Sequence, residues 1–304
     1  MKMRIFAFVK QSNSVFSLIY RQRKEQKRKA HPQPSAREGS RSMYTFAIVN
    51  QKGGVGKTTT AVQLVAGLSE RGYRVLACDM DAQANLTGTL LGEESLPEDA
   101  PTMYEVLTGE AQPGESVLEV RRGHLLPASR ANKNLSIIDA AIGNHPDKLY
   151  RLREALSKVA DRFDFAVVDT PPARDTLAYN ALAAATGVVI PTIAGEYSLD
   201  GIADLADSID KTRRYANPGL SILGVLITQH RANTKLAQGM AEGAAAMAAD
   251  LGTRVFPRPI REAVAIGESQ ACYTDIFDYA PRSEVAGDYR AMVDEILEEV
   301  ADGR

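Results

Sequence analysis

A glycine-rich segment between two apolar runs carries the clearest chemical signal in this chain. Residues 50–60 read NQKGGVGKTTT, after the strand-like run 45–49 and before the amphipathic run 61–68. The order is therefore strand, glycine loop, helix. Glycines lack a Cβ atom and can adopt positive φ, which turns successive backbone N–H groups toward one anion at a helix N-terminus. The segment predicts a phosphate-binding loop.

Individual positions of this loop predict separate contacts with a nucleotide. Lys57 is expected to reach the β and γ phosphates, and the Thr58 hydroxyl is expected to bind Mg²⁺. The ordinary pattern has a glycine where this chain has Gln51, and a second lysine, Lys52, precedes the glycines. The predicted nucleotide-binding residues are Gly53, Gly54, Val55, Gly56, Lys57, Thr58 and Thr59.

Three further segments with polar residues follow apolar runs. DMDAQAN begins at Asp79, the run 165–168 ends in Asp169, and PTIAGE spans residues 191–196. Ligands in open α/β sheets lie beyond the carboxyl ends of the strands. A single carboxylate at such a place is more often a turn former or a helix cap. Together with the loop, however, these segments supply candidates for a phosphate-binding loop, a cation site and a group that orients water. Phosphoryl transfer to water requires all three.

The alternation of apolar and helical patterns predicts an α/β fold. The chain has 304 residues, 44% of them hydrophobic, which is enough for one large domain. We expect a doubly wound, mostly parallel sheet covered on both faces, as in P-loop NTPases. Strands are expected at residues 45–49, 73–80, 125–128, 163–168, 187–193, 220–228 and 254–256, and helices at 61–68, 134–160 with a break near 144–146, 200–214, 236–251 and 284–300.

Charge divides the chain into two parts. Residues 1–42 carry 11 Lys and Arg against 2 Asp and Glu, a net charge of +9, and the remainder carries 25 against 36, a net charge of −11. We expect residues 1–42 to form a basic, disordered extension and residues 43–304 to form the domain. The extension could be a nucleic-acid or membrane tail, a targeting segment, or sequence read from an early start codon; Met43 before the first strand favours the last.

Cysteine and histidine usage argues against several classes of site. Cys78 and Cys272 cannot form a disulfide framework, and we expect both to be reduced and structural, as in a cytoplasmic protein. The four histidines are scattered and have no spacing typical of a metal site.

Four ordered motifs resemble those of the ParA family of partition ATPases, in the deviant phosphate-loop class that includes MinD. They are NQKGGVGKTTT, DMDAQAN, VVDTPPA and PTIAGEYSLDGI, and the resemblance runs from Met43 to near the C-terminus. It implies a slow ATPase that uses ATP and Mg²⁺, forms an ATP-dependent homodimer and binds DNA without sequence preference. It also implies plasmid or chromosome partition with a ParB-like partner, and a cytoplasmic, nucleoid-associated location.

The resemblance also implies roles for individual residues. Lys52 is similar to the signature lysine that reaches the partner's phosphates across the dimer. Asp81 resembles the carboxylate that positions water, and Asp169 resembles the one that helps to position Mg²⁺. Asp79 is similar to a neighbour of that metal. We therefore expect Lys52, Lys57 and Asp81 to be catalytic and Thr58, Asp79 and Asp169 to form the metal site.

Some positions match the family less closely. Pro191 and Glu196 lie where the family holds the adenine. The family has Pro-Gln-Gly where this chain has Ala-Gln-Ala at residues 82–84, and an arginine is expected near Asn233 where this chain has Arg231. Because the domain is acidic, DNA binding should require a local basic patch. The candidates are Lys211, Arg213, Arg214, Arg231, Lys235, Arg258 and Arg261.

Three other functions use the same kind of loop. A MinD-like membrane switch would need a basic amphipathic tail, whereas residues 292–302 are acidic, so no stable membrane association is expected. An iron–sulfur carrier would need paired cysteines, which Cys78 and Cys272 do not offer. An ATP-dependent ligase or synthetase is compatible with the loop, but DMDAQAN after the second strand argues against it.

Overall fold

The computed structural model describes residues 43–92, 94–97, 99–131, 134–172, 175–193, 199–231 and 235–302, without the side chains of residues 199–203, 235–241 and 302. The predicted basic extension, residues 1–42, lies outside the described residues. Its separation from the domain therefore stays a prediction.

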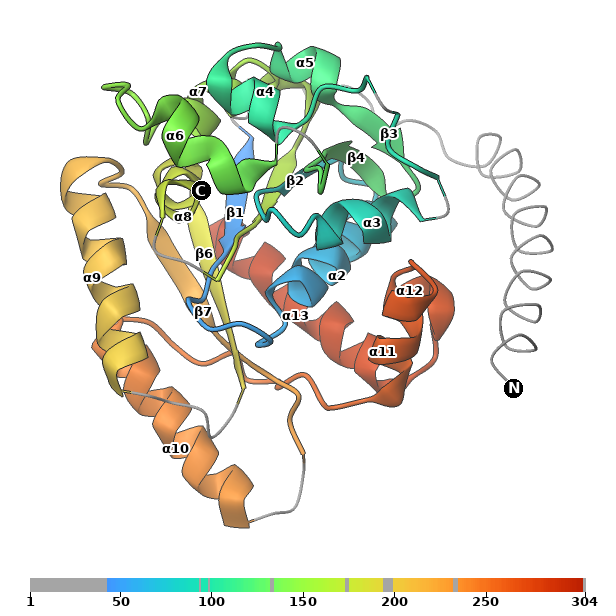
Figure 1. Ribbon diagram of the computed structural model, residues 1–304. Coiled ribbons are helices and arrows are strands. Elements are labelled where there is room, and N and C mark those ends of the chain that lie inside the picture. Colours follow the sequence, from blue (N-terminus) through green and yellow to red (C-terminus); the bar gives the residue numbers. More distant parts are fainter. Residues whose placement is uncertain are drawn as a thin grey trace. The chain divides into compact units, whose positions relative to one another are not determined.

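A single twisted sheet forms the centre of the described domain (Figure 1). Its seven strands lie in the order β3-β4-β2-β5-β1-β6-β7, and only the edge strand β3 is antiparallel to its neighbour. The predicted α/β class with a mostly parallel sheet is confirmed. The strands are β1 (Tyr44–Ile48), β2 (Val75–Asp79), β3 (Leu118–Val120), β4 (Gly123–Leu126), β5 (Phe165–Asp169), β6 (Gly187–Ile193) and β7 (Ser221–Thr228).

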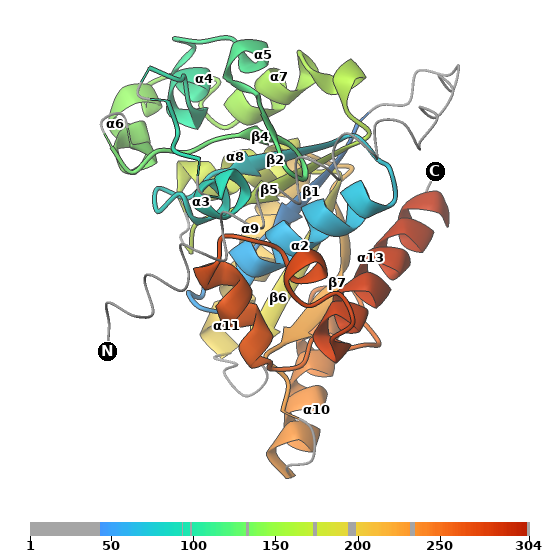
Figure 2. The ribbon, with the colours of Figure 1, turned by 90° about the vertical axis from the view of Figure 1, so that its right-hand side faces the viewer.

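Helices cover both faces of this sheet (Figures 1 and 2). One face is covered by α2 (Lys57–Glu70), α3 (Asn85–Leu91), α11 (Val264–Ala271), α12 (Ile276–Tyr279) and α13 (Glu284–Asp302). The other is covered by α4 (Met103–Thr108), α6 (Ile138–Ile142), α7 (Arg151–Ser157), α8 (Thr176–Ala184), α9 (Leu199–Tyr215) and α10 (Lys235–Asp250). The remaining elements are the short α5 (Pro113–Ser116) and the 3-10 turns Leu135–Ile137 and Ala160–Arg162.

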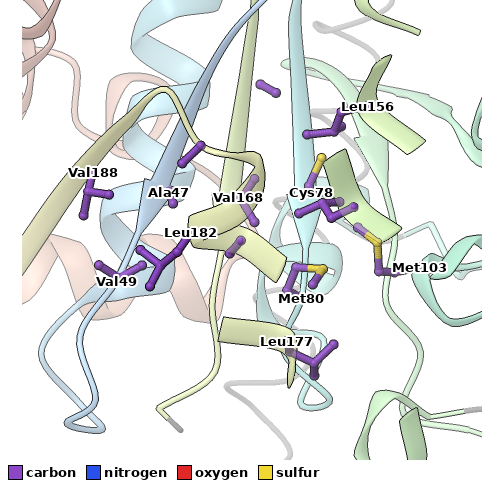
Figure 3. Close-up of a cluster of buried hydrophobic side chains, with 14 of the residues drawn as sticks. Ala47, Val49, Cys78, Met80, Met103, Leu156, Val168, Leu177, Leu182 and Val188 are labelled. Atoms are coloured by element: carbon purple, nitrogen blue, oxygen red, sulfur yellow. The ribbon is translucent and has the colours of Figure 1, made fainter. Parts of the chain in front are cut away.

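The central strands β1, β2, β5 and β6 are buried on both faces, which explains their unbroken apolar sequences. Within β1, Phe46 and Ile48 pack toward α2 and α13, whereas Ala47 packs toward the opposite layer. Cys78 in β2 and Val168 in β5 join Ala47 in that second cluster, shown in Figure 3. Two cores therefore hold the central strands, and the ends of those strands are fixed in position.

Three expectations about secondary structure need correction. Residues 254–256 do not form a strand, because only Val255 makes an isolated bridge, to Val225. The sequence reading missed β3, which has three residues and pairs only with β4 at the sheet edge. The expected break near residues 144–146 is confirmed, because turns occupy residues 143–150, but the helical parts of 134–160 are shorter than expected: a 3-10 turn and α6 precede the break and α7 follows it. No helix in the described part of the chain is both long and apolar enough to cross a bilayer.

The register of the strands brings three chain segments to one edge of the sheet. Asp79 at the end of β2 pairs in register with Asp169 at the end of β5, and Asp169 pairs with Ile48 at the end of β1. The loop from β1 to α2 begins at this level. The glycine loop and the two aspartates are therefore neighbours by strand pairing, as the sequence predicts.

The packing of α2 against α13 predicts an unusual response to an alanine substitution. A Cβ atom at Gly67 in α2 would lie 2.7 Å from Val293 Cγ2 in α13. Alanine favours a helix over glycine by about 1 kcal/mol, but overpacking costs about 1–3 kcal/mol. We expect Gly67→Ala to lower the free energy of unfolding by about 1 kcal/mol, measured by urea denaturation.

Gly88 in α3 is the matched control for this substitution. A Cβ atom there meets nothing within 4 Å, so Gly88→Ala should raise the free energy of unfolding by about 0.5–1 kcal/mol. Equal stabilisation by both substitutions would contradict the close contact between α2 and α13.

Candidate functional site

The loop between β1 and α2 turns its backbone at two glycines. Gly54 has φ +78° and Gly56 has φ +86°, values that residues with a Cβ atom adopt rarely. Gly56 is the N-cap of α2 and makes no side-chain cap hydrogen bond, and the first turn of α2 contains no acidic residue. The helix N-terminus therefore presents backbone N–H groups and a partial positive charge to an anion.

Side chains after β7 and β1 hold this loop in place. Thr228 Oγ1 donates to the carbonyl of Val55 at 2.9 Å, and Gln229 Nε2 donates to the carbonyl of Gly54 at 2.9 Å. The backbone N–H of Lys52 donates to Asn50 Oδ1 at 2.9 Å. Gln229 itself has φ +52°, a strained conformation that fixes its side chain on the loop. The loop is therefore preformed.

Lys57 is the first residue of α2 and is buried. Its Nζ donates to the carbonyl of Lys52 at 2.8 Å, which folds the side chain back over the loop. Burial lowers the pKa of Lys57, while the charges of Asp169 and Asp81 act in the opposite direction. A buried ammonium group beside two carboxylates is well placed to bind a phosphate oxygen.

Asp169 is the most unusual polar group in the described structure. It is fully buried, and neither carboxylate oxygen accepts a well-formed hydrogen bond among the described residues, although the Thr58 hydroxyl lies close enough to act on it. Burial, followed by the charge of Asp79, raises the pKa of Asp169 well above its ordinary value, while the Thr58 hydroxyl and Lys57 lower it by less. A buried carboxylate without a strong partner is costly, so this position fits the site of a bound cation.

The segment after β2 carries the other two aspartates. Asp79 Oδ2 accepts from the backbone N–H and the hydroxyl of Thr87, at 2.8 and 2.7 Å, and its Oδ1 accepts from the backbone N–H of Asp81 at 3.1 Å. Burial raises the pKa of Asp79 to about 6. Asp81 is only partly buried, and its Oδ1 accepts from the backbone N–H of Gln83 at 2.8 Å.

These contacts assign different roles to Asp79 and Asp169. Asp79 already accepts three hydrogen bonds, so it is a structural neighbour of the site rather than a free ligand. Asp169 and the Thr58 hydroxyl are the candidates for a metal site. Among the described residues, no group of three or more His, Cys, Asp and Glu could hold a metal ion by itself. Mg²⁺ usually takes one or two protein ligands together with water and phosphate oxygens, and Asp169 with the Thr58 hydroxyl matches that donor set.

A groove of about 730 Å³ runs from the glycine loop toward α11. Gly53, Gly54, Gly56 and the side chains of Lys57, Thr58, Thr59 and Asp81 line one part of it. Ile260, Arg261, Glu262, Ile266 and Gln270 line the other part. Gln270 Nε2 also donates to Thr59 Oγ1 at 2.7 Å, so α11 is attached to the first turn of α2.

The sequence did not predict the side of the groove that lies opposite the glycine loop. Thr228, Gln229 and the segment from Ile260 to Gln270 lie far along the chain from the loop and form no recognisable motif. The isolated bridge between His230 and Arg261 brings the two segments together after β7. Only the fold reveals this contact.

The two predicted adenine contacts are not part of the described groove. Pro191 is buried within β6, and its carbonyl accepts from Asn50 Nδ2 at 2.8 Å. Pro191 is not among the described residues that line the groove. Glu196 lies outside the described residues, so its role stays a prediction.

One group of the predicted DNA-binding cations lies near the C-terminal end of α9. Lys211 Nζ is 2.7 Å from Asp207 Oδ2, and Arg213 Nε donates to the carbonyl of Leu220 at 2.9 Å. The guanidinium group of Arg214 stacks over Tyr215, which is 71% exposed.

A second group lies beyond the opposite end of β7. Arg231 pairs with Glu262, and Arg258 and Arg261 both pair with Asp288. The eight residues of β7 separate the two groups by about 26 Å. The side chain of Lys235 lies outside the described residues. Within one chain, the predicted cations therefore do not form one patch, and most of those described are paired with carboxylates.

The cysteines lie in different environments. Cys78 is fully buried within β2, and burial raises the pKa of its thiol well above the ordinary value. Cys272 is exposed at the end of α11. The expectation that both are structural is therefore wrong for Cys272. The position of Cys78 does not suit an iron–sulfur cluster shared between chains, because its buried thiol cannot reach a surface.

Comparisons with known proteins agree with this site. A family described as an AAA domain matches residues 43–222. The chromosome-partitioning ATPase Soj of Thermus thermophilus is 38% identical over 84% of this chain and 96% of its own length. The chromosome partitioning protein ParA of Caulobacter vibrioides is 34% identical over 75% of this chain and 86% of its own length.

The fold also matches a solved structure. Cobyrinic acid a,c-diamide synthase from Mycobacterium smegmatis, crystallised with an ATP analogue and magnesium, is 30% identical, with a TM-score of 0.75 over 86% of this chain and 97% of that one. The doubly wound sheet, the glycine loop at the N-terminus of α2 and the Soj and ParA similarities lead to one conclusion. The chain belongs to the ParA family of P-loop ATPases.

Proposed function

We propose that this protein is an ATP-dependent dimerising ATPase that binds DNA without sequence preference and drives plasmid or chromosome partition. One observation carries the proposal: the buried, unpartnered Asp169 carboxylate lies beside Lys57 and Thr58 at the uncapped N-terminus of α2. This arrangement offers donors for phosphates and a carboxylate for a cation at the same place. We assign this activity to the domain of residues 43–304.

The loop residues bind the triphosphate in this proposal. Backbone N–H groups of Gly53 to Thr59 surround the phosphates, and Lys57 exchanges its hydrogen bond with the Lys52 carbonyl for β- and γ-phosphate oxygens. Mg²⁺, when bound, neutralises charge that develops on the phosphates. Thr58 and Asp169 would hold it, directly or through water, and its charge would remove the electrostatic cost of burying Asp169.

Asp81 is the proposed group that orients the attacking water. It lies on the groove, is only partly buried, and contributes to the electrostatic environment of both Lys57 and Asp169. Its Oδ1 already accepts from Gln83 N–H, which fixes the carboxylate and leaves Oδ2 to accept a proton from water. Asp79 keeps this segment in place through Thr87.

Lys52 is the proposed contact between two protomers. It is exposed at the start of the glycine loop, where its side chain can extend to a second chain that faces the same groove. A phosphate shared by two protomers makes the affinity of the dimer depend on the nucleotide, because hydrolysis removes the shared group. We place Pro191 and Glu196 near the adenine end only through the family resemblance.

DNA and a ParB-like protein are the proposed partners, in a cytoplasmic protein that joins the nucleoid in its ATP state. The names of the Soj and ParA relatives support a role in chromosome partition. The two cation groups of one chain lie apart, so we propose that the ATP dimer brings basic residues of two chains onto one DNA. Contact with phosphates rather than bases would explain the absence of sequence preference.

A MinD-like membrane switch fits the structure less well. The apolar face of α13, formed by Met292, Val293, Ile296 and Val300, is buried against the sheet layer. Its exposed side carries Asp294, Glu298 and Glu299. This helix therefore offers neither an available apolar face nor the positive charge that binding to an anionic bilayer needs.

A synthase is the second candidate, because a solved structure with that name is 30% identical. A synthase would couple ATP to the activation of a carboxylic acid substrate. The partition ATPase hydrolyses ATP to ADP and phosphate without such a substrate. ATP turnover by the purified protein with DNA alone distinguishes the two functions.

Two substitutions test the proposed cycle by sedimentation. Asp81→Ala should bind ATP, lose at least about tenfold in hydrolysis rate and accumulate as an ATP dimer on DNA, because the water is no longer oriented. Lys52→Ala should stay monomeric with ATP, because the contact across the interface is lost. A wild-type protein that remains a monomer when saturated with ATP and Mg²⁺ would overturn the proposal.

Because burying the charged Asp169 carboxylate destabilises the fold, replacing Asp169 by asparagine should stabilise the protein, by an amount that depends on pH. A pKa raised in the folded state means that the folded chain binds the proton more tightly, so stability falls as the pH rises through the raised pKa. In EDTA and without nucleotide, Asp169→Asn should therefore raise the melting temperature at pH 8, and the gain should shrink toward pH 5.

Asp164 provides the control near the other end of β5. It is paired with Arg74 at 2.9 Å and is 38% exposed, so Asp164→Asn should give no such gain. A lower melting temperature for Asp169→Asn than for the wild type at pH 8 would show that Asp169 is not strained.

DNA binding should depend on salt and on the arginines that lack a carboxylate partner. Arg214 has no carboxylate within 4.0 Å among the described residues, whereas Arg231 pairs with Glu262. We expect ATP-dependent DNA affinity to fall with salt, and Arg214→Ala to reduce the slope of the log–log plot by about 1. Arg231→Ala should reduce this slope by less. An affinity independent of salt would exclude phosphate contacts.

A further inference from the structure

The segment after β4 holds the segment that carries Asp81. Residues 127–131 follow β4, which pairs with β2, so both segments leave the sheet at the same edge. Arg130 Nη2 donates to Asn85 Oδ1 at 2.8 Å, and Arg130 Nε donates to the carbonyl of Gln83. One guanidinium group therefore spans two residues that follow Asp81.

Other contacts strengthen the same connection. Asn134 Nδ2 donates to the carbonyls of Ala82 and Ser129, both at 3.0 Å. The backbone N–H of Ala128 donates to Thr87 Oγ1 at 2.9 Å. The carbonyls of two consecutive residues, 82 and 83, thus both accept from side chains of the neighbouring segment.

The segment needs this support because its backbone is strained. Ala84 has φ +50° and ψ +39°, the left-handed region, which is unfavourable for a residue with a Cβ atom. Such a conformation persists only where its surroundings hold it. Gln83 lies between Asp81 and Ala84: its N–H fixes the Asp81 carboxylate and its carbonyl accepts from Arg130.

We propose that Arg130 is a positioning residue for hydrolysis, which fixes the Asp81 carboxylate by holding the Gln83 peptide and the Asn85 side chain. The inference rests on the proposed function, because it requires Asp81 to orient water. Arg130 suits this role since its planar group donates to two acceptors in one fixed geometry. It is exposed on a groove that also includes Thr58 and Asn85, and no carboxylate pairs with it among the described residues.

The predicted effect falls on turnover rather than on binding. Arg130 makes no described contact with residues 50–60, so the phosphate cradle stays intact when Arg130 is removed. A misplaced catalytic group can cost up to about a hundredfold in rate. For Arg130→Ala we expect kcat to fall about tenfold, with the KM for ATP changed by less than about twofold. Sedimentation with ATP should show more dimer than for the wild type, because hydrolysis is slower.

Two further variants make the experiment decisive. Arg130→Lys keeps the charge but cannot donate to both acceptors in the same plane, so its kcat should also fall, and this variant decides the outcome if Arg130→Ala does not fold. The control is Arg162→Ala, an exposed arginine before β5 at the opposite edge of the sheet. It should keep the kcat and KM of the wild type.

The outcomes separate this inference from the proposed function. A wild-type kcat in Arg130→Ala or Arg130→Lys, with hydrolysis lost in Asp81→Ala, overturns the role of Arg130 alone. A wild-type rate in Asp81→Ala overturns the assignment of Asp81 itself. A raised KM with unchanged kcat in Arg130→Ala would show that Arg130 contributes to nucleotide binding, which contradicts a positioning role.

Discussion

The site depends on a concentration of negative charge at the carboxyl edge of a parallel sheet. Strand pairing brings Asp79 and Asp169 level with each other, and both are fully buried. Hydrogen bonds from Thr87 and Asp81 partly compensate Asp79, whereas neither oxygen of Asp169 accepts a well-formed hydrogen bond among the described residues. A buried carboxylate left in this state destabilises the protein by itself. The fold therefore favours the binding of a cation, and the adjacent helix N-terminus favours the phosphates that accompany it.

The surrounding structure keeps this edge from relaxing. Two hydrophobic layers fix the central strands, and each loop at their ends is held by a neighbour that is distant in sequence. Thr228 and Gln229 hold the glycine loop, and Arg130 and Asn134 hold the segment that carries Asp81. Strained backbone at Ala84 and Gln229 occurs at these two supports. Two of the three described non-glycine residues with positive φ thus lie where side chains must be placed accurately, and the third, Tyr273, follows α11.

The sequence was sufficient for the sheet, the glycine loop and the grouping of Asp79, Asp81 and Asp169, because each follows a buried strand in a recognisable order. It could not predict β3, whose three residues are too few for a periodic pattern. It also missed the wall from Ile260 to Gln270 and the contact of Arg130, since both depend on strand order rather than on local sequence. The cations proposed for DNA share a charge but no local pattern, and the fold divides them between two ends of β7.

The central claim is that the unpartnered Asp169, Lys57 and the N-terminus of α2 form one site for ATP and Mg²⁺. Titration calorimetry of the purified protein with a non-hydrolysable ATP analogue tests it most directly. We expect saturable binding in the presence of Mg²⁺, with a large loss of affinity in EDTA. Absence of binding with Mg²⁺ present, or equal affinity with and without the metal, would contradict the account.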